Sequence, residues 1–330
     1  MYALGEDPFY KVPIFQLDNL AAFQPAAGDE ERIYHLPIGD GMTLSFLTKP
    51  IPSEGGAVRV GLHSAKGAST TDDHFFQPLN ILRNSRAAYV AFADPTLTLN
   101  PSNRLSWYVG TPNVDPDDWM EAVIRKILAA SGAIYVVTEG SSAGGFVSLR
   151  LATRFANAVA VPRIAQTDLF RYSITRPLVE TLSTAWRGYS YDDIMAEFPQ
   201  RFRVADLYSD PAWNRGNLVY YVHNAGDVEH TRNHLSPFLD ELGVGPDAVK
   251  ALSDRVVVSR PYAGDGHVGV PSHYWPGDDA LALSILTTIR PPGESSQEEP
   301  AFVKPAGVPN AKLDSAARKR TLSRHTIPNF

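Results

Sequence analysis

From residue 57 onward, short apolar runs alternate with amphipathic stretches of helical length. We predict strands at residues 57–62, 87–92, 134–138, 158–161, 218–222 and 255–259, and helices at residues 75–83, 117–130, 144–155, 231–242 and 278–288. Strands that are separated by helices are joined by crossovers, which makes neighbouring strands parallel. The sequence therefore predicts an α/β fold, a doubly wound and mostly parallel sheet with helices on both faces.

The rest of the chain divides around this pattern. Residues 1–30 carry several prolines and read as an irregular lead-in, and residues 33–37 and 42–47 flank a Gly-Asp-Gly turn that predicts a β-hairpin. We assign residues 31–290 to one domain. Within it, residues 169–210 exceed what a crossover needs, so they form either a helical cap over the carboxyl edge of the sheet or ordinary packing helices. Residues 291–330 form a Pro-, Gly- and Ser-rich tail with a basic end, which favours a solvated charge run.

Composition excludes several classes of protein. The chain has 330 residues, 44% of them hydrophobic and 20% charged, as expected of a globular domain. A net charge of −6 argues against nucleic acid as the main partner, and the lack of cysteine excludes disulfides and thiolate chemistry. Glu6 and Asp7 stand where a signal peptide carries positive charge, and no window is long and apolar enough for a membrane span. We expect a cytoplasmic protein.

One five-residue motif points to nucleophilic catalysis. Gly140-Ser141-Ser142-Ala143-Gly144 matches G-x-S-x-G, with an apolar strand before it and a helix after it. The turn is so tight that the residues two before and two after the serine cannot carry large side chains, and Gly140 and Gly144 occupy these positions. We therefore predict that Ser142 is the nucleophile, held at the carboxyl edge of the sheet with the Ala143 N–H beside it to stabilise developing negative charge.

A serine hydroxyl needs a base to take its proton and a carboxylate to orient that base. His267 lies in a glycine-rich loop after the last strand, so we predict that it is the base. Asp227 lies in the loop after strand 218–222 and is the predicted acid; Glu229 is a possible substitute, and Asp168, after strand 158–161, is a rival.

A second backbone donor to the oxyanion is expected from the loop after an early strand. The loop at residues 63–66 fits by position, which makes Ser64 and Ala65 the candidates. A plain connecting loop is an equally good interpretation of these residues, since no HGGG-type run is present.

With these residues assembled, residues 30–290 resemble the α/β-hydrolase superfamily. More narrowly, the chain resembles bacterial hydrolases related to an accessory protein of a dedicated glycoprotein-secretion system, and similar proteins linked with surface-glycan synthesis. The resemblance lies in the run GSSAGGF at residues 140–146, the segment Gln166-Thr167-Asp168 and the loop at residues 264–271. The resemblance implies removal or transfer of an O-linked acyl group, such as acetyl, on a sugar.

The sequence thus predicts a serine hydrolase or acyltransferase that works through an acyl-enzyme on Ser142 and acts on a small-molecule or glycan ester. No metal or organic cofactor is expected, and the oligomeric state is open. The alternative is a non-catalytic subunit of a glycan-synthesis or secretion complex that keeps the same frame for binding.

Overall fold

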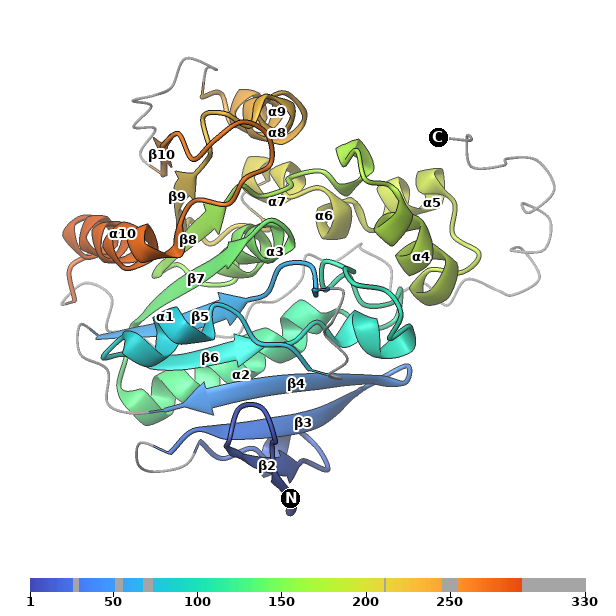
Figure 1. The fold of residues 1–330 in the computed structure, drawn as a ribbon, viewed down its shortest axis with the longest axis vertical. Helices are drawn as coiled ribbons and strands as arrows, with labels where there is room; N and C mark the ends of the chain where they lie inside the picture. The colour runs from blue at the N-terminus through green and yellow to red at the C-terminus, as the bar shows by residue number, and fades with distance from the viewer. Residues whose placement is uncertain (26–29, 51–55, 68–73, 211, 245–254, 293–330) are drawn as a thin grey trace.

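A ten-stranded sheet runs through the computed structural model, which describes residues 1–25, 30–50, 56–67, 74–210, 212–244 and 255–292 (Figure 1). The strands are β1 (Tyr2–Glu6), β2 (Pro13–Gln16), β3 (Arg32–Gly39), β4 (Met42–Lys49), β5 (Ala57–Leu62), β6 (Ala88–Phe92), β7 (Tyr135–Ser141), β8 (Ala158–Arg163), β9 (Leu218–Val222) and β10 (Val256–Ser259). Their order is β1-β2-β3-β4-β6-β5-β7-β8-β9-β10. The six strands from β5 to β10 pair in parallel, which confirms the predicted mostly parallel sheet.

The order of the strands reverses beside β5. From β5 the chain crosses to β6 on one side, and then returns to β7 on the other side and continues outward to β10. In a parallel sheet such a reversal leaves a crevice at the carboxyl ends of the two neighbouring strands, where ligands commonly bind. The loops that follow β5 and β7 meet at this place.

Apolar side chains on alternate residues bury both faces of the sheet. Val58 and Val60 of β5 pack on the side of α2 (Pro116–Ser131), α3 (Ala143–Ala152) and α9 (Ser236–Glu241). Ala57 packs on the opposite side, which is covered by α10 (Trp275–Ile289), while α1 (Leu79–Asn84) covers that side near β6. This two-residue alternation is what a strand buried on both faces requires.

The N-terminal region departs from the prediction. The expectation of an irregular lead-in at residues 1–30 is wrong for β1 and β2, which pair with each other and extend the sheet beyond β3. The sequence signal is weak because β1 is exposed along its whole length and so shows no buried alternation. The predicted hairpin is confirmed as the antiparallel pair β3 and β4, and its turn residues Gly39, Asp40 and Gly41 all have positive φ.

Two predicted helices show the most instructive differences from their expected bounds. The helix predicted at residues 75–83 begins only at Leu79, the first residue of α1. The one predicted at 231–242 is divided into a π-helical turn (Thr231–Leu235) and α9, and it is preceded by the short helix α8 (Val228–His230). Pro237 lies in the first turn of α9, and since proline has no N–H, it cannot continue the regular hydrogen-bond ladder through this point.

Residues 169–210 are mainly helical. They contain a 3₁₀ turn (Leu169–Arg171) and the helices α4 (Arg176–Ala185), α5 (Tyr191–Glu197), α6 (Pro199–Phe202) and α7 (Ala205–Ser209). Asn103 donates to the Thr181 hydroxyl of α4 at 3.0 Å, and Arg201 of α6 donates to the carbonyl of Thr111 at 2.6 Å. The insertion therefore packs on the chain that follows β6, at the carboxyl edge of the sheet.

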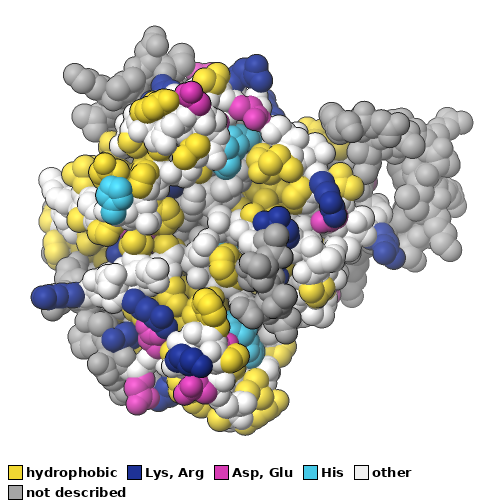
Figure 2. Space-filling view, in the orientation of Figure 1, with side chains coloured by type: hydrophobic (Ala, Val, Ile, Leu, Met, Phe, Trp, Pro, Cys, Tyr) yellow, Lys and Arg dark blue, Asp and Glu magenta, His cyan; other side chains and the backbone are white. Residues whose placement is uncertain are grey.

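The surface in Figure 2 is mixed in character. On this face, basic and acidic side chains of the described residues are interspersed among hydrophobic and uncharged ones. No helix among the described segments combines the length and the apolar character that crossing a membrane would require. The predicted tail lies outside the described residues from residue 293 onward.

Candidate active site

Ser142 lies at the junction of β7 and α3, in a strained turn. Its φ is 53° and its ψ is −115°, a region that residues with a Cβ rarely occupy. A Cβ on Gly144 would overlap the carbonyl oxygen of Leu62, and one on Gly140 would lie 2.5 Å from the carbonyl carbon of Gly144. The steric reason given above for the two glycines is therefore confirmed. The turn lifts Ser142 out of the strand and places it at the N-terminus of α3.

The side chain of Ser142 is hydrogen-bonded to Gln166, a residue whose role the sequence did not reveal. The amide Nε2 of Gln166 lies 3.0 Å from Ser142 Oγ and 3.1 Å from the Nε2 atom of His230. The indole N–H of Trp107 donates to Gln166 Oε1 at 3.2 Å. Gln166 and Trp107 are fully buried. The nucleophile candidate thus contacts a buried polar network.

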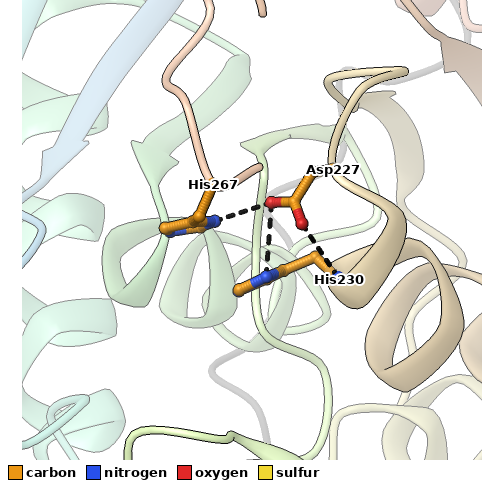
Figure 3. A group of neighbouring side chains, drawn as sticks. All are labelled: Asp227, His230 and His267. Atoms are coloured by element: carbon orange, nitrogen blue, oxygen red, sulfur yellow. Dashed lines mark hydrogen bonds and ion pairs between the residues drawn. The ribbon is translucent and has the colours of Figure 1, made fainter. Parts of the chain in front are cut away.

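Asp227 and His267 form a hydrogen-bonded pair. His267 Nδ1 lies 2.8 Å from Asp227 Oδ2, while Asp227 Oδ1 accepts the backbone N–H of His230 at 3.0 Å and so caps α8 (Figure 3). Burial raises the pKa of Asp227, but the hydrogen bonds from the His230 N–H and the His267 ring lower it more, so the net pKa is below its ordinary value. Asp227 is therefore a buried carboxylate that holds the Nδ1 edge of the His267 ring, whose side chain is 33% exposed.

Asn224 joins the loops that carry this pair. Its amide group donates to the carbonyls of Gly264 at 2.9 Å and Gly266 at 3.0 Å, and its Oδ1 accepts the N–H groups of Gly226 at 3.1 Å and Ala263 at 2.9 Å. The bonds to Ala263, Gly264 and Gly266 join the loop after β9 to the loop after β10. The bond to Gly226 closes the loop after β9. A single buried side chain thereby sets the position of His267 relative to Asp227.

His230 is a second imidazole at the same carboxylate. Its Nδ1 lies 3.3 Å from Asp227 Oδ2, and its ring stacks on that of His267 with centroids 3.9 Å apart and an interplanar angle of 16°. Burial, and then the neighbouring His267 ring, lower the pKa of His230 to about 4. A neutral His230 fits its Nε2 atom as acceptor of the Gln166 amide. Sequence reasoning missed this residue; its place three residues after Asp227, in the first helical turn, was the available signal.

Ser142 and His267 are not hydrogen-bonded to each other. Both residues are described, and within the described chain the side chain of Ser142 bonds only Gln166, while that of His267 bonds only Asp227. Catalytic hydrogen bonds are commonly long before a substrate is in place. All three candidates nevertheless lie on loops at the carboxyl edge, after β7, β9 and β10 respectively.

Asp168 lies in a different environment from Asp227. Its side chain caps the 3₁₀ turn by accepting the N–H of Phe170 at 3.0 Å, and it contacts the Arg171 guanidinium at 3.4 Å. Burial raises its pKa. Among the described residues these partners account for its polar contacts, so His267 is not paired with Asp168.

The loop after β5 lies against the elbow, since a Cβ on Gly144 would also come within 3.0 Å of the His63 carbonyl oxygen. The N–H and the hydroxyl of Ser64 both face Gln77 Oε1, at 3.4 and 2.9 Å. The N–H of Ala65 has no hydrogen-bond partner within the described segments, and the residue is exposed. The predicted loop is therefore near Ser142, but the Ser64 N–H is directed elsewhere.

A metal ion fits the Asp227, His230 and His267 group poorly. Their ligand atoms lie within 4.8 Å of one another. The lone pair of an imidazole nitrogen lies in the plane of its ring, and zinc binds at about 2.0–2.1 Å. Two nearly parallel rings stacked one above the other cannot both direct such a lone pair at one ion. The geometry favours hydrogen bonding to Asp227 instead.

Comparison with known proteins gave no match to a protein-family model and none to a curated sequence. Solved structures do resemble the chain. A capsule O-acetyltransferase of Neisseria meningitidis serogroup A, solved in complex with CoA, is 14% identical, with 77% of this chain and 94% of that chain covered and a TM-score of 0.50. Carboxyl esterase 2 from the fungus Tuber melanosporum is 15% identical, with 88% and 94% covered and a TM-score of 0.46. Together with the strand order, the likeness identifies the architecture of this chain as an α/β-hydrolase fold.

Proposed function

We propose that the protein is a serine hydrolase or acyltransferase that forms an acyl-enzyme on Ser142. The observation that carries the proposal is the strained Ser142 at the N-terminus of α3, on the same sheet edge as the hydrogen-bonded pair Asp227 and His267. A serine held at positive φ is costly to the fold, and such strain is concentrated at functional sites. A buried carboxylate behind an imidazole is the arrangement that makes the imidazole an effective base.

In the proposed reaction, Ser142 Oγ attacks the carbonyl carbon of an ester while His267 Nε2 takes the hydroxyl proton. The carbonyl becomes a tetrahedral oxyanion, which the Ala143 N–H at the start of α3 stabilises. The oxyanion then reforms the carbonyl, the bond to the alcohol breaks, and His267 returns the proton to the departing alcohol oxygen. Water or a second hydroxyl group repeats these steps in reverse and releases the acyl group from Ser142.

For the substrate we propose an O-acylated glycan. The support is the resemblance of the elbow and of the Gln166-Thr167-Asp168 segment to glycan-linked hydrolases, and the fold likeness to a capsule O-acetyltransferase motivates the choice of acetyl esters for the test. An acetylated sugar is therefore the first natural substrate to assay. A simple acetyl ester such as p-nitrophenyl acetate serves as the general probe.

The proposal is tested by labelling with a fluorophosphonate and by hydrolysis of p-nitrophenyl acetate. We expect the wild-type protein to do both, Ser142→Ala to do neither, and the neighbouring Ser141→Ala to behave as wild type. Circular dichroism and thermal unfolding confirm that each variant is folded. A folded wild type that neither labels nor hydrolyses the ester would overturn the proposal and favour the alternative, a non-catalytic binding subunit.

A further inference from the structure

We infer that Gln166 is a catalytic residue whose side-chain amide donates a hydrogen bond to the oxyanion of the reaction on Ser142. The inference rests on the proposed function and deepens it. In place of a second backbone donor from the loop after β5, a side chain that already contacts the reacting oxygen serves, since Gln166 Nε2 lies 3.0 Å from Ser142 Oγ.

The orientation of the Gln166 amide follows from its neighbours. The indole N–H of Trp107 is a donor only, so the atom of Gln166 that it contacts at 3.2 Å must be the carbonyl oxygen. The amino group of Gln166 is thereby turned toward Ser142 and His230. Because both Trp107 and Gln166 are fully buried, water does not compete for these bonds, and the amide has no freedom to rotate without losing its partners.

His230 supports the same assignment from the other side. Its Nε2 atom lies 3.1 Å from Gln166 Nε2, so one of the two nitrogens donates and the other accepts. An amide nitrogen carries hydrogens and cannot accept, so His230 Nε2 is the acceptor and its ring is neutral. One amide hydrogen of Gln166 is thus engaged by His230, and the other points at Ser142 Oγ.

This second hydrogen is well placed for the transition state. When Oγ bonds to the carbonyl carbon, the oxyanion forms on an atom attached to that same carbon, next to Oγ. As this C–O bond forms, negative charge collects on the former carbonyl oxygen. The Gln166 N–H then transfers its hydrogen bond to the oxyanion, which the Ala143 N–H also stabilises in the proposed reaction. Fixed donors of this kind contribute most when they are buried and preorganised.

The loop after β5 offers a poorer donor. The Ser64 N–H faces Gln77 at 3.4 Å, and the Ser64 hydroxyl faces the same oxygen, so both must leave that partner before they can serve. Ala65 is an exposed residue, and no contact of its N–H with the elbow is seen among the described residues. Gln166 already has its donor at the reacting atom.

Two variants of Gln166 test the inference. Gln166→Met keeps the length of the side chain and removes both donors, so kcat for p-nitrophenyl acetate should fall by about 10² to 10³, the loss expected for one oxyanion donor, with little change in KM. Gln166→Glu should be at least as impaired at neutral pH, because a carboxylate repels the oxyanion. Relative to wild type it should recover as the pH falls, since a protonated carboxyl group regains an O–H donor.

The recovery of the Gln166→Glu variant at low pH distinguishes a donor from a packing residue, because a structural defect does not respond to protonation in this way. Gln16→Met on β2, which removes an amide far from the elbow, is the matched control and should keep wild-type kcat. Folded Gln166 variants with wild-type kcat would overturn the inference. If Gln166→Met fails to fold, a Gln166→Glu variant that shows no relative recovery on acidification overturns it as well.

The two proposals fail differently. If the wild type does not react with the fluorophosphonate, the proposed function itself is wrong. If the wild type reacts, Ser142→Ala does not, and the Gln166 variants react at the wild-type rate, only the role of Gln166 is wrong.

Discussion

Two imidazoles face a single carboxylate oxygen of Asp227. His267 is bonded to Oδ2 at 2.8 Å, and His230 approaches the same atom at 3.3 Å. Only the ring of His267 is partly exposed, and the Nε2 atom of His230 is already bonded to Gln166. At the residue scale, this difference in exposure and partner is why His267 is the better base candidate, although both rings share the acid.

The role of Asp227 is tested by Asp227→Asn. Asparagine caps helices about as well as aspartate, so the bond to the His230 N–H and the start of α8 should be kept. The negative charge that orients and stabilises the His267 ring is lost, and kcat should fall by a factor on the order of 10⁴. Steady-state kinetics on the folded variant measure this effect. Asp168→Asn is the control, and equal losses in the two variants would contradict the assignment of the acid.

His63 should make stability depend on pH. Its Nε2 atom accepts the N–H of Asp94 at 2.9 Å, and burial lowers its pKa to about 4. The unfolded chain binds a proton near pH 6.5 but the folded chain does not, so this residue makes the free energy of unfolding decrease as the pH falls from about 6.5 to 4. Below pH 4, the full loss of unfolding free energy from this residue is on the order of 3 kcal/mol.

The variant His63→Gln isolates this contribution. Its free energy of unfolding should be less dependent on pH than that of wild type between pH 6.5 and 4, by the equivalent of about one proton. Urea denaturation at a series of pH values provides the comparison. All other groups titrate equally in wild type and in His63→Gln. Parallel curves of unfolding free energy against pH would therefore show that His63 is not held neutral in the folded protein.

At the scale of elements, the elbow depends on the close approach of α3 to β5. Gly144→Ala would drive a methyl group into the Leu62 carbonyl, so the turn must open or α3 must move. We expect a loss of stability of about 1–3 kcal/mol, as for overpacking, and a loss of most activity as Ser142 shifts. Thermal unfolding and ester hydrolysis measure the two effects.

Gly277→Ala is the matched control for the elbow. Gly277 lies in the first turn of α10, and a Cβ there would meet nothing within 4 Å. This variant should be as stable as wild type or slightly more stable, because alanine is the better helix residue. If both glycine variants behave alike, steric contact at Gly144 is not what shapes the elbow.

Elements with strong periodicity were predictable from the sequence, and residues on loops were less so. The strand at residues 218–222 was predicted with the bounds that β9 has, because five consecutive buried residues leave a clear apolar run. The exposed β1 leaves no such pattern. In the candidate site, Ser142, Asp227 and His267 could be named from the motif and from chain order. Gln166 and Trp107 are 59 positions apart in the sequence, and only tertiary folding brings them together.

At the scale of the whole molecule, a buried charge network ties α10 to the strands beneath the elbow. Arg59 of β5 contacts both Glu139 of β7 and Asp279 of α10, and Arg163 of β8 also contacts Asp279. Glu139 lies three residues before Ser142, and the Arg163 carbonyl accepts the Ser142 N–H at 2.9 Å. The network therefore links the far face of the sheet to the position of Ser142.

Asp279→Ala should destabilise the protein strongly. It removes a buried carboxylate that contacts both Arg59 and Arg163, and breaking a buried ion pair in this way costs about 3–5 kcal/mol. Chemical denaturation gives the free energy of unfolding. Asp240→Ala, at an exposed position on α9, should change it little. Equal stability of the two variants would show that the network does not hold α10 on the sheet.

The central claim is the covalent intermediate on Ser142, and the most direct test is to observe it. Wild-type protein is mixed with p-nitrophenyl acetate, quenched in acid during turnover, digested and analysed by mass spectrometry. We expect one acetyl group on the peptide that carries Ser142, present in Ser141→Ala and absent in Ser142→Ala. Turnover without any acetylated peptide, or an acetyl group on another residue, would contradict it.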